Sequence, residues 1–176
     1  MAIATEPFTT HDGNQEMSRN IETRGWHIVS VAETPDSPGW AFTVGLHRSH
    51  THPEIIIAGL PIETMEAILE ALASDVTHGA YYDAGASSAG VLEDLTCEFR
   101  PVDRLRYEPY LESALRYYGD DEFPAVQCVW PDANNRLPGE RGAEPELADL
   151  QPLLHAPRGS GLDGVDPSGV TGQRMR

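Results

Sequence analysis

Apolar and polar residues alternate most clearly over residues 39–46, which read GWAFTVGL. Trp40, Phe42, Val44 and Leu46 hold one set of alternate positions, and Ala41, Thr43, Gly45 and His47 hold the other. A period of two residues is typical of a β-strand with one face in the core. Residues 24–33 also read as a strand, and the stretch ETPDSPG (33–39) between the two carries turn residues. The pattern therefore predicts a β-hairpin whose core face holds Trp40, Phe42 and Val44.

A third strand and a long helix are predicted next. Residues 53–60 (PEIIIAGL) form a short apolar run, and Pro53 suits the first position of a strand. Residues 61–79 carry an apolar stripe at intervals of three and four residues, formed by Ile62, Met65, Leu69, Leu72 and Val76. This spacing predicts an amphipathic helix that covers the sheet.

The second half of the chain repeats the alternation of strand and helix. Residues 80–90 are rich in glycine and serine and read as a loop. Residues 91–103 predict one or two strands, residues 108–119 a second helix, and residues 123–132 a last strand.

This order of elements predicts an α+β fold with a mainly antiparallel sheet and two principal helices. We expect a flexible N-terminal tail over residues 1–19, a single globular domain over residues 20–155 and a disordered C-terminal tail over residues 156–176. A chain of 176 residues is long enough to bury the core of one domain.

The charge balance narrows the classes of partner. The chain has 28 acidic and 12 basic residues, a formal net charge of −16. Such a charge argues against binding to nucleic acid or to an anionic membrane, which both attract cationic surfaces. The sequence has no apolar run of the about 18 residues that a membrane span needs and no secretory signal, so we expect a cytoplasmic protein. Cys97 and Cys128 lie in apolar, strand-like runs and are interpreted as reduced core thiols.

The segment GLHRSHTHPE (45–54) concentrates the candidate chemistry. It holds His47, His50 and His52, with Glu54 directly after Pro53. An extended backbone would direct His50, His52 and Glu54 to one side, and two imidazoles with a carboxylate are a known ligand set for zinc or non-haem iron. The alternative is a solvated connection between strands, with His52 bonded to a backbone group.

A pocket at the end of the second strand is a related hypothesis. The small side chains of Ala41, Thr43 and Gly45 would leave volume beside His47, unless a helix packs tightly against that face. His52 and His27 could reach the same pocket, and Glu54 could hold an imidazole or a metal ion there. The candidate catalytic residues are therefore His47, His52, Glu54 and His27.

The ordered blocks GWHIVSV, GWAFTVGLHRSHTHPEIIIAGLP, FRPV, YLESALRYYG and FPAVQCVWPD resemble a bacterial family known as domain of unknown function 4262. The resemblance runs from about Arg24 to Leu154. Members carry Gly-Leu-His, His-Pro-Glu and Trp-Pro-Asp elements, which match residues 45–47, 52–54 and 130–132 here. Many relatives then carry a Phe-Pro-Trp run, where this chain has Leu137-Pro138-Gly139. The resemblance implies a soluble single-domain bacterial protein and no particular activity.

Two functions remain open from the sequence. The first is a small binding or interaction module with a histidine-lined pocket, whose partner is a small molecule or a protein. The second is a small enzyme, metal-dependent or based on histidine acid–base chemistry, that uses the His47-His50-His52-Glu54 cluster with a divalent transition metal such as zinc as its possible cofactor.

Overall fold

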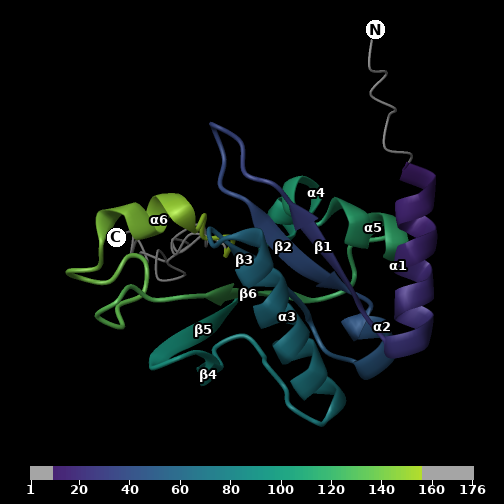
Figure 1. Cartoon of the computed structure of the whole chain (residues 1–176), viewed down its shortest axis with the longest axis horizontal. Coiled ribbons are helices and arrows are strands. Elements are labelled where there is room, and N and C mark those ends of the chain that lie inside the picture. The colour runs from purple at the N-terminus through teal and green to yellow at the C-terminus, as the bar shows by residue number, and fades with distance from the viewer. Residues whose placement is uncertain (1–9, 156–176) are drawn as a thin grey trace, which may run out of the picture.

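The protein is built on one six-stranded sheet, seen in a computed structural model that describes residues 10–155 (Figure 1). The strands lie in the order β1-β2-β3-β6-β5-β4, and only the pair β3–β6 is parallel. The strands are β1 (His27–Val31), β2 (Trp40–Val44), β3 (Glu54–Ala58), β4 (Ser87–Leu92), β5 (Leu95–Pro101) and β6 (Ala125–Val129). The predicted single α+β domain with a mostly antiparallel sheet is confirmed.

The described residues also contain six α-helices and one turn of 3-10 helix. These are α1 (Thr10–Arg24), α2 (Leu46–His50), α3 (Ile62–Thr77), η1 (Arg104–Arg106), α4 (Tyr107–Tyr110), α5 (Glu112–Tyr118) and α6 (Pro145–Leu150). The two principal helices predicted from the sequence are therefore fewer than the helices of the described part. No helix of the described part is long and apolar enough to cross a membrane.

The predicted hairpin and the third strand are confirmed. β1 pairs with β2 in antiparallel fashion, with His27 opposite Val44 and Val31 opposite Trp40. β2 in turn pairs with β3, again antiparallel. The predicted turn over residues 33–39 contains a bridge between Thr34 and Ser37.

Helix α3 covers one face of the sheet. Its buried stripe includes Met65, Leu69 and Leu72, as the sequence predicts. The stripe packs on side chains from the middle strands, among them Ala41 and the free thiols Cys97 and Cys128, which are buried. The helix predicted over residues 61–79 is thus confirmed.

The opposite face of the sheet is covered by α1, α4 and α5 (Figure 1). Phe42 and Val44 of β2 are buried there, 2% and 0% exposed, against Met17 and Ile21 of α1. Both faces of β2 are therefore covered.

Three local predictions are wrong. Residues 10–19, predicted as part of a flexible tail, belong to α1. Residues 87–90, predicted as loop, begin β4. The single helix predicted over residues 108–119 is divided at Leu111, whose backbone leaves helical geometry at φ −125° and ψ 30°. The tails predicted over residues 1–9 and 156–176 lie outside the described residues.

The chain beyond β6 returns to the sheet. The side-chain amide of Gln127 makes two hydrogen bonds to this segment. Its Nε2 donates to Pro152 O at 2.8 Å, and its Oε1 accepts from Leu154 N at 2.9 Å. The carbonyl of Leu150, at the end of α6, lies so close to Gly59 that a Cβ at this position would be 2.1 Å from it. Gly59, at φ +85°, therefore allows α6 to contact the end of β3.

Candidate functional site

The histidine segment folds as a helical turn between two strands. β2 ends at Val44, Gly45 adopts φ 107°, and α2 begins at Leu46. A Cβ at Gly45 would lie 2.9 Å from Gly25 O and 2.9 Å from a side-chain carbon of Ile21, so only glycine fits this turn. The extended backbone that would align His50, His52 and Glu54 does not form, because α2 runs to His50 and Thr51 is left-handed at φ 53°.

Glu54 is the central polar group of this segment. Its carboxylate has no exposed surface and accepts four hydrogen bonds. The donors are Thr43 Oγ1 (2.7 Å), Gly45 N (2.9 Å), His47 N (3.1 Å) and Tyr118 Oη (2.5 Å). Burial raises the pKa of Glu54 above its ordinary value, and the four hydrogen bonds offset this only in part. Glu54 therefore joins β2, β3, the start of α2 and the end of α5.

Tyr118 completes this arrangement from α5. Its ring stacks on Phe123 with ring centroids 4.6 Å apart. Burial and the neighbouring Glu54 carboxylate raise the pKa of the Tyr118 phenol, so the phenol stays protonated and donates a hydrogen bond to Glu54.

His52 is fully buried and has both ring nitrogens engaged. Nε2 accepts a hydrogen bond from Tyr82 N at 2.8 Å, so the ring proton lies on Nδ1, which contacts Pro53 O at 2.6 Å. Burial lowers the pKa of His52 and favours this neutral ring. The His52 ring thus links Tyr82, which follows α3, to Pro53, which precedes β3.

The hydrogen bonds of the His52 ring involve neither of the other two histidines of the segment. The His47 ring is half-buried and meets the Tyr118 ring edge-on, at 6.0 Å between centroids. Its Nδ1 is buried without a partner among the described residues. His50 is exposed, and its Nε2 lies 2.8 Å from where a Cβ on Gly25 would be.

The structure therefore does not bring the proposed ligands together. His50, His52 and Glu54 have separate partners, and residues 10–155 contain no group of three histidine, cysteine or carboxylate side chains arranged to hold a metal ion. The open floor expected beside His47 is also wrong, since Ala41 and Thr43 have no exposed surface. A helix packs on that face, which was the alternative that the sequence left open.

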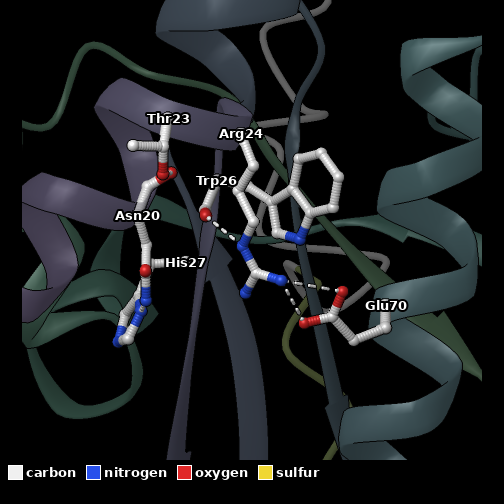
Figure 2. Close-up of polar contacts among 6 residues, drawn as sticks. All are labelled: Asn20, Thr23, Arg24, Trp26, His27 and Glu70. Atoms are coloured by element: carbon white, nitrogen blue, oxygen red, sulfur yellow. Dashed lines mark hydrogen bonds and ion pairs between the residues drawn. The ribbon is translucent and has the colours of Figure 1, made fainter.

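His27 lies in a different place, at the edge of the sheet. The Asn20 amide of α1 donates to Nδ1 of His27 at 2.9 Å (Figure 2). Nδ1 is therefore the acceptor and Nε2 carries the proton. Burial lowers the pKa of the His27 ring. His27 is opposite Val44, but neither His47 nor His52 lines the groove beside it.

Arg24 links α1 to α3 next to this histidine. Its guanidinium lies 5.1 Å from the centroid of the Trp26 ring and 2.9 Å from a Glu70 oxygen, and the dashed lines in Figure 2 mark its contacts with Glu70. Its Nε also donates to Trp26 O at 3.2 Å. This contact neutralises Glu70 and fixes the end of α1 against α3.

Two hollows lie along β1 and α3. The first, which we name the edge groove, has a volume of about 410 Å³. It is lined by Glu16, Asn20, Arg24, His27, Ile28, Glu63, Glu66, Ala67 and Glu70. The second, the turn hollow, has a volume of about 790 Å³ and is lined by residues 32–39, residues 59–63, Asp149 and Leu150. Glu63 lines both, so the hollows adjoin.

Carboxylates dominate these hollows. They are Glu16, Glu33, Asp36, Glu63, Glu66, Glu70 and Asp149. Among residues 10–155, Arg24 is the only basic side chain of lysine or arginine type that lines either hollow, and it is paired with Glu70. Glu66 accepts a hydrogen bond from Ser30 Oγ at 2.6 Å, which orients it toward β1.

Several residues that this geometry makes important are absent from the sequence-based prediction of the site. Tyr118 and Tyr82 act on Glu54 and His52 from 64 and 30 residues away, and no local spacing indicates such contacts. Asp132 of the Trp-Pro-Asp element accepts from Asn134 N, Arg136 N and Glu144 N. Desolvation raises the pKa of the Asp132 carboxyl, but the hydrogen bonds from these backbone donors outweigh it, so the pKa lies below its ordinary value. An aspartate two residues before an Asn-Asn pair is a turn signal that could have indicated this loop.

Fold and site together define a small α+β domain with a buried carboxylate at one sheet end and an acidic groove at one sheet edge. The family model described as Domain of unknown function (DUF4262) matches residues 20–144, which is most of the chain. The chain belongs to this family. No curated protein and no solved structure matches it.

Proposed function

We propose that this domain is a small binding module that recognises a cationic partner on the acidic surface formed by the edge groove and the turn hollow. The observation that carries the proposal is the lining of these hollows. Seven carboxylates face one arginine, and that arginine is already paired. Clefts lined by one sign of charge concentrate ligands of the opposite sign.

The histidine segment supports this proposal over the enzyme alternative. Both His52 nitrogens and both Glu54 oxygens are occupied by contacts within the fold. An acid–base residue must reach a substrate proton, and buried groups with complete sets of partners lack that access.

The proposal is tested with a short capped peptide in which arginine and valine alternate, titrated by calorimetry. The test variant combines Glu16→Gln, Glu63→Gln and Glu66→Gln, which removes three charges from the edge groove. The control combines Glu93→Gln, Glu108→Gln and Glu122→Gln, three exposed carboxylates outside both hollows. Both variants have the same net charge.

We expect the wild type and the control to bind the peptide with similar Kd. Because each exposed charge pair contributes up to about 1 kcal/mol, the groove variant should bind roughly tenfold more weakly or worse. Equal weakening in both variants would mean that the peptide responds only to net charge, and the proposed surface would be wrong.

A further inference from the structure

β1 is a terminal strand of the sheet. Its five residues, His27–Val31, pair with β2 on one side, and no described strand pairs with them on the other. An edge strand presents a row of backbone N–H and C=O groups to a further strand. We propose that an extended basic segment of a partner protein binds by adding a strand to this edge of β1. This inference rests on the proposed function, because it names the partner of the same surface.

The edge groove crosses this open edge at the start of β1. It is lined by α1 residues, which lie on one face of the sheet, and by α3 residues, which lie on the other. A hollow lined from both faces must pass over the edge between them, and His27 and Ile28 are the β1 residues that line it. The two helices therefore flank the first part of the line that an added strand would take.

The α3 wall carries three carboxylates over a length that two alternate side chains of a strand can span. Glu63, Glu66 and Glu70 repeat at intervals of three and four residues along α3, a length of about 10 Å from first to last. Side chains on one face of an extended peptide repeat about every 7 Å. Basic side chains at alternate positions therefore reach the α3 wall, while Glu16 faces the groove from α1.

The other terminal strand is less suited to this role. β4 pairs with β5 through a register shift between Ser88 and Leu92. Irregularities of this kind twist an edge away from further pairing. Neither the edge groove nor the turn hollow includes a residue of β4. The inference therefore concerns β1 alone.

The experiment compares the alternating arginine–valine peptide with the same peptide methylated at every backbone nitrogen. The two have identical side chains and charge, but the methylated form cannot donate hydrogen bonds to β1. Amide hydrogen exchange of residues 27–31 is followed by NMR, with the amides of residues 87–92 as the internal control.

With free unmodified peptide at about ten times its Kd, the outward-facing amides of β1 should exchange about tenfold more slowly, and those of β4 should not change. The methylated peptide should bind at least tenfold more weakly. If both peptides bind equally without protecting β1, strand addition is overturned while the acidic binding surface stands. Protection of β4 in place of β1 also overturns it, and loss of all binding overturns the proposed function as well.

Discussion

Glu54 shows how one residue of the histidine segment organises its surroundings. Its carboxylate receives donors from β2, from the first turn of α2 and from α5, and Glu54 itself begins β3. Thr43 links the same network back to β3, since its Oγ1 accepts from Ile55 N at 2.9 Å. A group with no exposed surface can stay ionised only if such donors replace water. The His-Pro-Glu element therefore has a structural explanation in its glutamate.

The raised pKa of Glu54 predicts how a Glu54→Gln variant responds to pH. Below the carboxyl pKa of the unfolded chain, about 4.3, the side chain is protonated in both states. As the pH rises from there through the raised folded pKa, the unfolded carboxyl ionises first, so the wild type loses stability relative to the variant. The loss is about 1.4 kcal/mol for each pH unit between the two pKa values.

Urea unfolding of both proteins across this pH range measures the difference. Glu93→Gln, which removes one exposed charge, is the control and should stay parallel to the wild type. A stability difference between Glu54→Gln and the wild type that does not change with pH would contradict the raised pKa of Glu54. A wild type that becomes more stable relative to the variant as the pH rises would also contradict it.

At the scale of elements, α1 is the largest departure from the sequence prediction. Its residues are mostly polar, and over residues 13–24, where burial is described, only the side chains of Met17 and Ile21 are buried. They are four residues apart, and Arg24 followed by a left-handed Gly25 closes the helix. These signals are weak in isolation, because a short amphipathic helix is stable only when its apolar face packs on the rest of the protein.

An Ile21→Ala variant tests whether α1 is part of the core. Ile21 is 6% exposed and packs in the cluster that contains Phe42 and Val44. Its truncation should lower the free energy of unfolding by about 2–5 kcal/mol, measured in urea. Glu22→Ala, at the exposed neighbouring position, should change it by less than about 0.5 kcal/mol. Similar small effects in both variants would mean that α1 does not stabilise the sheet.

Across the whole molecule, repulsion among the charges that give the net charge of −16 destabilises the compact folded state. Only four ion pairs lie among the described residues, and three of them join side chains that are more than a third exposed. Exposed pairs contribute little to stability. The carboxylates of the two hollows therefore repel one another without compensation, apart from the pair of Arg24 with Glu70.

Sodium chloride should therefore stabilise this protein. Raising its concentration from about 0.05 M to about 0.5 M shortens the screening length below the separation of most surface charges. We expect the melting temperature to rise by a few degrees, which corresponds to a gain on the order of 1 kcal/mol in the free energy of unfolding. Chloride is preferred to sulfate, which stabilises proteins by exclusion from their surface. A melting temperature that falls with added salt would show that attractive pairs outweigh the repulsion.

The elements with strong periodicity can be read from the sequence alone. Residues 39–46 alternate and residues 61–79 carry a stripe, and each pattern is buried by only one kind of structure. The run that forms β3 has no alternation, and only its short length and its flanking proline and glycine indicate a strand. The α+β class and the antiparallel pairs followed from the order of these elements and their short connections. The acidic charge also comes from composition alone.

Only the tertiary structure decided the role of each histidine. Pattern within GLHRSHTHPE cannot indicate that Tyr118 and Tyr82 would engage Glu54 and His52, because these tyrosines lie on elements far along the chain. The same is true of the edge groove, which forms where α1, β1 and α3 meet. Side-chain spacing sets which residues share a face of one element, whereas contacts between elements depend on how the sheet orders them in space.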